Sequence, residues 1–363
     1  MIRPSLLLFC CVLAGCAARP DTRTIWPVGA STTQGETERI FVATTRGTAT
    51  IPADGFTSLR SPQPHFAEFA VSIPPDHVPG EIEWPKGPTN PRTDFAVASH
   101  TRLDEKAFIR RVNAASENST GVFVHGYNYN FPEALFRTAQ MTADAQISDA
   151  PVLFSWPSSA SLLGYASDRE SVTYSRDALA ELLTRLADTS GGKPVTVFGH
   201  SMGGWLVMET LRQMRIAGKD EALSHLEVVL AAPDIDVDVF RQQLAVIGRM
   251  EIPMVIMVSP DDRALGLSAL AGQRTRVGAL DITDPAVQAA AQQSDVVLID
   301  ISAVGASSRL NHDRYIQLAA AYPALGRETR QGSTFTEAGA FVLSSTGQLL
   351  SAPLRVVDAA LGQ

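Results

Sequence analysis

Short apolar segments alternate with longer segments of helical period over most of the chain from Gly121 onward. The apolar segments are rich in β-branched residues, which is typical of strands buried on both faces. They lie at 122–124, 152–154, 195–198, 228–230, 255–258 and 296–299. Strands separated by helices pair in parallel, with helices covering both faces of the sheet. The sequence therefore predicts an α/β domain in which the strand ends that form sites gather at one edge.

Three further strands are predicted upstream, at 39–44, 65–73 and 94–99. The 363 residues are 45% hydrophobic and 19% charged, a balance that suits one large globular domain. We place this domain at residues 38–322. The preceding residues 16–37 are rich in Thr, Pro and Gly and are predicted to be a flexible tether, whereas residues 323–363 form an extension whose role the sequence does not indicate.

The segment VTVFGHSMGGW at 195–205 holds a serine between glycines, directly after one of these strands. The Gly-x-Ser-x-Gly pattern alone is weak evidence, but its place between a strand and a helical segment is the setting of a nucleophile elbow. In such an elbow a strained turn raises the serine hydroxyl above the sheet edge, and the glycines allow close approach of the backbone. Ser201 is therefore the candidate nucleophile.

A serine nucleophile needs a histidine to take its proton and an acid to orient that histidine. After such an elbow the acid precedes the histidine along the chain. Beyond His200, which adjoins the serine, only His225 and His312 lie downstream. His312 lies in a polar loop after the last predicted strand and is the candidate base, whereas His225 precedes every candidate acid and is interpreted as a surface or capping residue.

Either Asp261 or Asp262, which follow the strand at 255–258, can orient His312. We expect one of the two to do so and the other to cap the next helix. Asp234, at the end of the preceding strand, is a further alternative acid. The alternating aspartates at 234–238 lack the glycine and the late glutamate of a calcium loop and are better explained as a helix start. A mechanism based on serine, histidine and an acid needs no metal and no organic cofactor, and none is expected.

Two backbone N–H groups are needed to stabilise the oxyanion that forms during ester cleavage. One is expected from Met202, the residue after the nucleophile, and the other from Tyr127 in the loop after the strand at 122–124. Gly126 allows that loop to turn, and His125 is expected to bond within it. Three more residues are expected to line or adjoin the pocket: Asn128, His200 and Trp156.

Trp156 has two readings, as a wall of the acyl pocket or as a core residue. The segment 158–171 contains Leu162 and Leu163 and is a candidate small lid, and no long cap insertion is evident elsewhere. A shallow site of this kind favours short to medium acyl esters.

The motifs TTRG, HGYNYNF, FSWPS, GHSMGG, APDID, DDRAL and NHDRY, in this order, resemble the α/β-hydrolase superfamily. More narrowly they are similar to an esterase- and lipase-like branch known mainly as a domain of unknown function, type 900. The resemblance covers about residues 38–322 and implies an eight-stranded, mostly parallel sheet with helices on both faces. It also favours Asp262 over Asp261 as the acid that acts with Ser201 and His312.

Residues 1–16, MIRPSLLLFCCVLAGC, have the layout of a secretory signal, with one basic residue, an apolar run and small residues at its end. The ending LAGC resembles a bacterial lipobox, which predicts a signal peptide at 1–15 and a lipid-bearing Cys16. The chain would then be anchored in the cell envelope, on the periplasmic face of the outer membrane, because residue 17 is Ala.

The formal net charge of -8 and the pI near 5.4 offer no basic field for nucleic acid, which is excluded as a partner. The sequence thus predicts a serine carboxylic ester hydrolase acting on a small-molecule or lipid ester. Two alternatives remain: an acyltransferase or phospholipase at the envelope, and a non-enzymatic binding protein that keeps the hydrolase scaffold.

Overall fold

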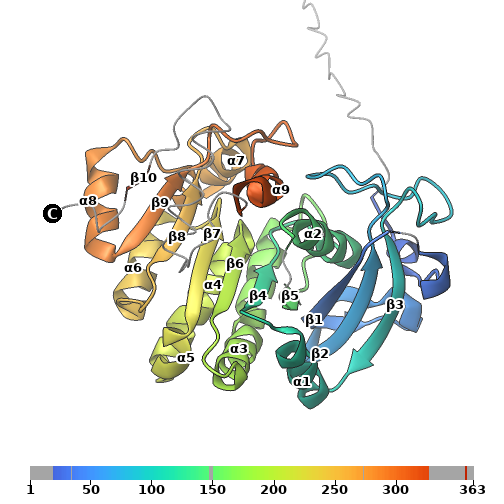
Figure 1. The fold of residues 1–363 in the computed structure, drawn as a ribbon. Coiled ribbons are helices and arrows are strands. Elements are labelled where there is room, and N and C mark those ends of the chain that lie inside the picture. The colour runs from blue at the N-terminus through green and yellow to red at the C-terminus, as the bar shows by residue number, and fades with distance from the viewer. Residues whose placement is uncertain (1–18, 34, 147–149, 273, 327–355, 358–363) are drawn as a thin grey trace, which may run out of the picture.

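The computed structural model describes residues 19–33, 35–146, 150–272, 274–326 and 356–357. Its strands form one sheet in the order β10-β9-β8-β7-β6-β4-β5-β1-β2-β3 (Figure 1). The strands are β1 (Thr37–Thr48), β2 (Phe56–Ser72), β3 (Ala96–Leu103), β4 (Thr120–Val124), β5 (Ala150–Ser155), β6 (Val195–His200), β7 (Leu226–Ala231), β8 (Met254–Val258), β9 (Val296–Asp300) and β10 (Val356–Val357). The α-helices are α1 (Glu105–Ala115), α2 (Phe131–Asp144), α3 (Tyr165–Thr189), α4 (Met202–Ile216), α5 (Asp220–Ser224), α6 (Val237–Ile247), α7 (Arg263–Gly272), α8 (Pro285–Ser294) and α9 (Arg314–Gly326).

The mostly parallel α/β fold is confirmed. Strands β9, β8, β7, β6, β4, β5 and β1 pair in parallel, whereas β2, β3 and β10 pair antiparallel with their neighbours. Each of the nine segments predicted to be strands contributes to the sheet, so the count of eight implied by the resemblance is too low. The tenth strand, β10, comes from the C-terminal extension and consists of two residues.

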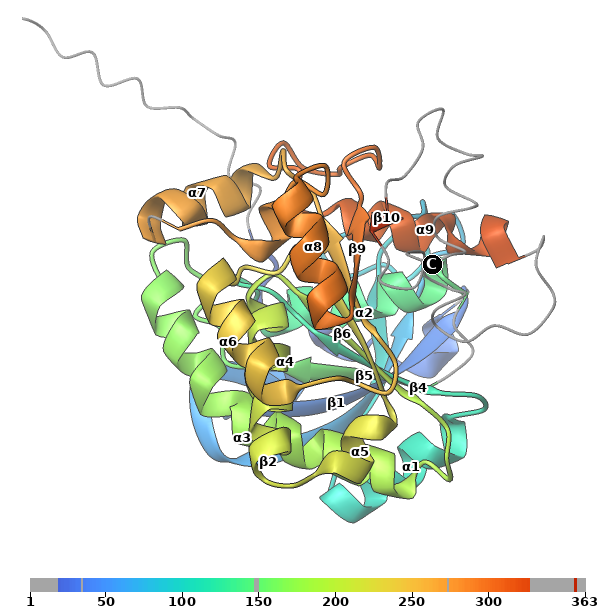
Figure 2. The same ribbon diagram turned by 90° about the vertical axis from the view of Figure 1, so that its left-hand side faces the viewer.

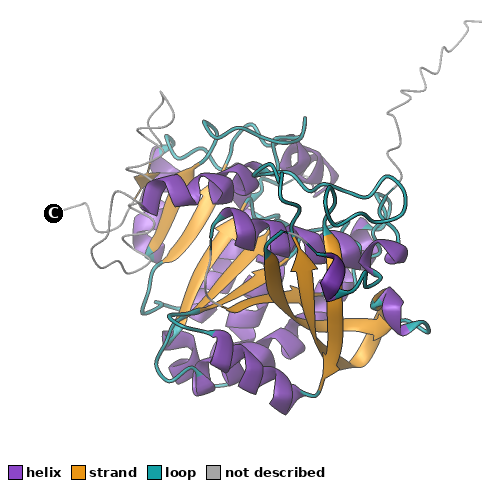
Figure 3. Cartoon of the chain, turned by 45° about the vertical axis from the view of Figure 1, so that its right-hand side comes forward, coloured by secondary structure: helices purple, strands orange, loops and turns teal. Residues whose placement is uncertain are grey.

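Successive residues of the parallel strands point to opposite faces of the sheet and enter two separate hydrophobic clusters. In β4, Val122 and Val124 pack under α3 and α4, whereas Phe123 packs with α2 on the other face. Figure 2 shows α3, α4 and α6 on one side of the sheet and α2 and α9 on the other. Helices thus flank the central layer of strands (Figure 3), and the loops that follow the parallel strands lie at one edge of it.

The prediction of a flexible tether at 16–37 is wrong for the described part of that segment. A short 3-10 helix, η1 (Thr22–Ile25), places the fully buried Ile25 in the cluster formed by α2. Trp26 Nε1 donates to Asp54 at 2.7 Å, and Val28 N donates to the carbonyl of Val97 at 2.9 Å. The burial of Ile25, which is worth about 1.5–3 kcal/mol, holds this segment on the domain. The composition of the segment alone does not reveal that contact.

The boundary predicted between residues 322 and 323 falls inside α9, so the helix continues into the expected extension. The predicted signal peptide at 1–15 and the predicted lipid site at Cys16 lie outside the described residues and stay predictions. Within the described part of the chain, no helix has the length and hydropathy needed to cross a membrane.

The loop between β2 and β3 is fastened to α2 by His77. Its ring nitrogens contact Glu83 and Asp144, each at 2.8 Å. Burial lowers the pKa of His77, but the two carboxylates outweigh it and raise the pKa above its ordinary value. The protonated ring therefore stabilises the fold, and this contribution is complete below about pH 6.5 and is lost as the pH rises through the folded-state pKa.

Replacing His77 with glutamine is expected to lower the free energy of unfolding by about 1–3 kcal/mol at pH 6, because bonds between charged groups are lost. The difference from the wild type should shrink as the pH is raised to 8 and beyond. Urea unfolding of both chains across this range measures it. A difference that stays constant or grows with pH would contradict the assigned charge.

Candidate active site

Ser201 lies between β6 and α4 in a backbone conformation that non-glycine residues rarely adopt. Its φ is 53° and its ψ is -121°, and its N–H donates to the carbonyl of Ala231 at the end of β7. A conformation of this kind costs about 1–3 kcal/mol and persists only where the surroundings hold it. The expected elbow between strand and helix is therefore present, with the strain that such a turn carries.

Two glycines, Gly203 and Gly126, allow close packing of the backbone around the elbow. A Cβ added to Gly203 would lie 2.3 Å from the carbonyl oxygen of Val124, and one added to Gly126 would lie 3.1 Å from Ser201 Cβ. The first contact packs the start of α4 against the end of β4. The second brings the β4–α2 loop (residues 125–130) against the serine, as expected for a loop that supplies an oxyanion donor.

His312 and Asp262 meet at the same edge of the sheet. His312 Nδ1 donates to Asp262 Oδ2 at 2.6 Å, and the aspartate side chain is fully buried while that of His312 is 19% exposed. Asp262 Oδ1 also accepts from the N–H of Leu265 at 2.9 Å, in the first turn of α7. The prediction that one aspartate of the Asp261–Asp262 pair orients His312 and the other caps the helix is thus wrong. Asp262 makes both contacts.

The other two candidate acids are occupied elsewhere. Asp261 accepts from Arg314 at 2.6 Å and from Asn311 at 2.9 Å, so it holds both sides of the loop that carries His312. Asp234 accepts from Tyr165 and Ser268 at 2.9 and 2.6 Å, and Arg276 Nε lies 3.3 Å from it. Neither contacts the ring of His312.

His200 links the nucleophile segment to the loop of the histidine. Its Nε2 donates to the carbonyl of His312 at 3.2 Å, and its ring lies 4.8 Å from the His312 ring and 4.3 Å from that of Tyr315. Burial, together with the neighbouring His312, lowers the pKa of His200 well below its ordinary value. A neutral His200 fits this role, because its one N–H then serves a carbonyl oxygen.

Ser201 itself is only 4% exposed. Within the described residues its hydroxyl makes no hydrogen bond to His312, whose ring packs against the neighbouring His200.

Two fully buried aromatic side chains, those of His125 and Trp156, support the β4–α2 loop. His125 is fully buried, and its Nδ1 donates to the carbonyl of Gly126 at 2.9 Å, as expected for a structural residue. Burial, with Arg46 nearby, lowers the pKa of His125 to about 3. Trp156 is also fully buried, stacks on His125 at 4.9 Å and donates to its carbonyl at 2.7 Å. Of its two readings the core residue is correct, and the pocket wall is not.

The two donors predicted for an oxyanion occupy the expected elements. Met202 is the first residue of α4, where backbone N–H groups have no partner within the helix. Tyr127 follows Gly126, and its hydroxyl donates to the carbonyls of Ser161 and Leu162 at 2.9 and 2.7 Å. Asn128, which has a φ of 63°, accepts hydrogen bonds from Arg19 through its backbone and side-chain oxygens.

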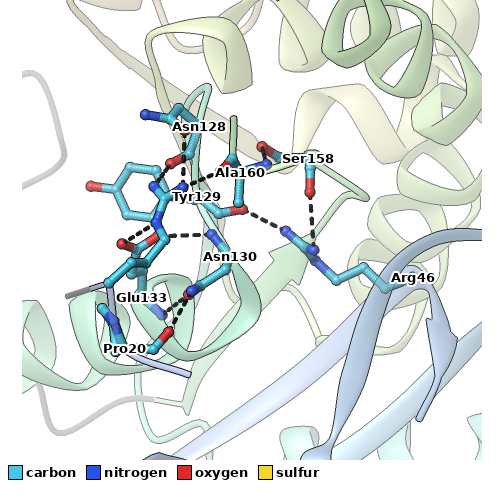
Figure 4. A network of polar contacts seen from close by, with 9 residues as sticks. Pro20, Arg46, Asn128, Tyr129, Asn130, Glu133, Ser158 and Ala160 are labelled. Carbon is cyan, nitrogen blue, oxygen red and sulfur yellow. Dashed lines mark hydrogen bonds and ion pairs between the residues drawn. The ribbon is translucent and has the colours of Figure 1, made fainter. Parts of the chain in front are cut away.

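Two charged residues that the sequence reasoning missed support this loop. Arg46 is 1% exposed and donates to the carbonyl of Tyr129 and the hydroxyl of Ser155, at 2.9 and 2.8 Å, and its contacts with Tyr129 and Ser158 are drawn in Figure 4. Burial lowers the pKa of Arg46 to about 9, which leaves it cationic at neutral pH. The available signal was the arginine of TTRG, two residues after the strand predicted at 39–44 and within β1 in the structure.

The second is Asp168, fully buried in the first turn of α3. It accepts from the hydroxyl of Ser158 at 2.6 Å and from the N–H groups of Ser159 and Asn128 at 2.7 and 3.4 Å. Asp168 therefore joins the β4–α2 loop to the β5–α3 loop (residues 156–164). It could not be singled out from sequence, because an acid in the first turn of a helix is common.

No group of three or more metal-binding side chains is present among the described residues.

The family model described as "Alpha/beta hydrolase of unknown function (DUF900)" matches residues 101–328. An uncharacterised protein of Nostoc sp. is 39% identical over 61 residues, which is 17% of this chain and 16% of that protein, so the matched segment spans about a sixth of the relative. A solved structure from Agrobacterium vitis S4, described as a hydrolase, is similar with a TM-score of 0.31 and 13% identity, over 65% of this chain and 85% of the other.

Proposed function

We propose that this chain, a member of these α/β hydrolases, is a serine carboxylic ester hydrolase. The family match shows the membership, because it spans more than half of the chain. The observation that carries the proposal is the hydrogen bond of 2.6 Å between His312 and Asp262, at the sheet edge where the strained Ser201 lies. A loop that reaches the serine through Gly126 supplies the surroundings for an oxyanion.

In the proposed reaction Ser201 Oγ attacks the ester carbonyl and His312 takes its proton. Asp262 holds the ring through Nδ1, which leaves Nε2 to receive that proton and then to pass it to the departing alkoxide. The N–H groups of Met202 and Tyr127 stabilise the oxyanion. A water molecule, deprotonated by His312, then releases the acid from the acyl-enzyme and restores Ser201.

The proposal is tested on the purified chain with a fluorophosphonate, which attaches to activated serines, followed by peptide mapping of the adduct. The adduct is expected on Ser201. A p-nitrophenyl ester series from acetate to palmitate measures turnover and is expected to peak at short to medium acyl chains. Folded protein that neither carries the adduct on Ser201 nor cleaves any ester would favour the binding-protein alternative.

The same assays separate hydrolysis from acyl transfer. Hydrolysis yields the free acid in the presence of an added alcohol, whereas a transferase yields a new ester of that alcohol. We propose hydrolysis, and a preferred new ester would reassign the reaction to the alternative class without moving the nucleophile.

Arg46 offers a further prediction. Replacing it with methionine removes the donors to Tyr129 and Ser155 and is expected to lower the free energy of unfolding by about 1–3 kcal/mol. Because the β4–α2 loop loses its support beside the oxyanion, ester turnover should fall by about tenfold to a hundredfold. Denaturant unfolding and kcat measure the two effects.

A matched control for Arg46 is Arg60→Met. Arg60 is partly exposed and bonds the hydroxyl of Ser171 and the carbonyl of Ser167, both on α3, rather than a carbonyl of the β4–α2 loop. Its replacement should leave kcat within about twofold of the wild type, because surface substitutions have small effects. Equal losses of kcat in both variants would contradict the role given to Arg46.

A further inference from the structure

Five exposed leucines lie on segments at the sheet edge that carries Ser201. Their exposed fractions range from 45% to 97%, which is unusual for so apolar a side chain. They are Leu162 and Leu163 in the β5–α3 loop, Leu267 and Leu270 on α7, and Leu310 in the loop before α9. We call these five residues the rim patch. Apolar groups gathered on one surface mark an interaction site more often than scattered ones do.

Hydrogen bonds connect the segments that carry the rim patch. The hydroxyl of Tyr165, two residues after Leu163, lies 3.2 Å from that of Ser268 on α7. At the start of α7, the N–H of Arg263 donates to the carbonyl of Leu310 at 2.9 Å. Leu267 and Leu270 are three residues apart and lie on the same face of the helix. The patch is therefore built around α7, and Leu310 is two residues from His312.

The N-terminal end of the described chain is fixed at the same edge. Arg19 donates from its guanidinium to Glu133 at 2.8 Å, to Asn128 at 3.1 Å and to the carbonyl of Ala160. Figure 4 shows Asn128 and Ala160 side by side in this network. Arg19 thus contacts Ala160, two residues before Leu162, and holds the start of the described chain against the β4–α2 and β5–α3 loops.

We propose that the rim patch docks on the surface of a phospholipid bilayer, with the Ser201 edge turned toward the lipid. The proposal rests on the predicted lipid at Cys16. That residue is three positions before Arg19, a separation that an extended chain spans in about 11 Å at most. A lipid on Cys16 would therefore keep the Ser201 edge, where Arg19 contacts the β4–α2 loop, near the membrane.

The composition of the patch suits that surface. Exposed leucines at a membrane boundary enter the acyl region, and basic residues beside them meet the lipid phosphates. Two exposed arginines lie on the same segments: Arg309 precedes Leu310 directly, and Arg263 begins α7, four residues before Leu267. The ester substrates of the proposed reaction would then be those presented at a lipid surface.

The docking is tested with the full chain on vesicles of phosphatidylethanolamine and phosphatidylglycerol, by hydrogen exchange of the backbone. Exchange in the β5–α3 loop and α7 is expected to be about tenfold slower in the wild type than in a Leu162→Ser/Leu163→Ser chain on the same vesicles. Ile216→Ser is the matched control. Ile216 is 57% exposed at the far end of α4, away from the Ser201 edge, so its loss should leave the exchange unchanged.

This measurement does not depend on ester cleavage, because a Ser201→Ala chain should show the same slow exchange. Failure of the proposed function therefore leaves the docking result intact. The proposal is overturned if the wild type does not associate with the vesicles, or if the two leucine positions make no difference. It is also overturned if the patch exchanges slowly without lipid, which would indicate cover by another part of this chain or by a second copy.

Discussion

Replacing Ser201 with alanine will reduce ester turnover by about 10⁵- to 10⁶-fold while the chain remains folded. The reason is that the proposed reaction begins with a bond to Ser201 Oγ, and no other group at the site can take its place. Among the described residues near it, Met202 and Gly126 offer only backbone N–H groups and His312 is needed as the base. Turnover is measured with the preferred p-nitrophenyl ester, and folding by circular dichroism.

The matched variant Ser201→Gly should be equally inactive but more stable than Ser201→Ala by about 1 kcal/mol, because glycine adopts a φ of 53° without strain. Thermal unfolding of the two variants measures the difference. Residual turnover above about a hundredth of the wild type in either chain would show that Ser201 is not the nucleophile. Equal stability would contradict the strain at the elbow while leaving the nucleophile in place.

Replacing Asp262 with asparagine will reduce kcat by about 10⁴-fold. The amide cannot accept the Nδ1 proton as the carboxylate does, so the ring of His312 loses the tautomer that leaves Nε2 free to act as a base. An asparagine oxygen still caps a helix well, so the first turn of α7 and the fold should survive. This substitution therefore separates the two tasks that Asp262 performs.

Asp261→Asn is the control, since it removes one carboxylate from the same doublet. The Asp261 side chain is 51% exposed and pairs with Arg314, so its change should cost less than about tenfold in kcat. Steady-state kinetics of both variants decide between the acids. A larger loss at Asp261 than at Asp262 would reverse the assignment.

The sheet was predictable because its strands carry strong local signals. Segments such as 195–198 and 228–230 are short, apolar and β-branched, and only buried strands accommodate them in number. The position of Ser201 followed from the same logic, since a polar residue between glycines ends one of these strands. The antiparallel pairing of β10 with β9 was beyond reach, because a strand of two residues is too short to show an apolar alternation.

The supports of the site were harder to predict than its reactive groups. Arg46 and Asp168 are 122 residues apart in the chain, and their shared task of bracing the β4–α2 loop exists only after the sheet has formed. Ile25 was hidden in a segment whose composition resembles a linker. In both cases long-range packing decided the outcome, and local propensity is silent about it.

The two tasks of Asp262 have a consequence for how relatives of this chain would diverge. In a relative without catalytic activity, replacing the strained Ser201 with glycine would stabilise the fold, so the serine should be lost early. Asp262 would persist because α7 still needs its cap. An aspartate retained at position 262 is therefore weak evidence that a relative is an active enzyme, whereas a serine retained at position 201 is strong evidence.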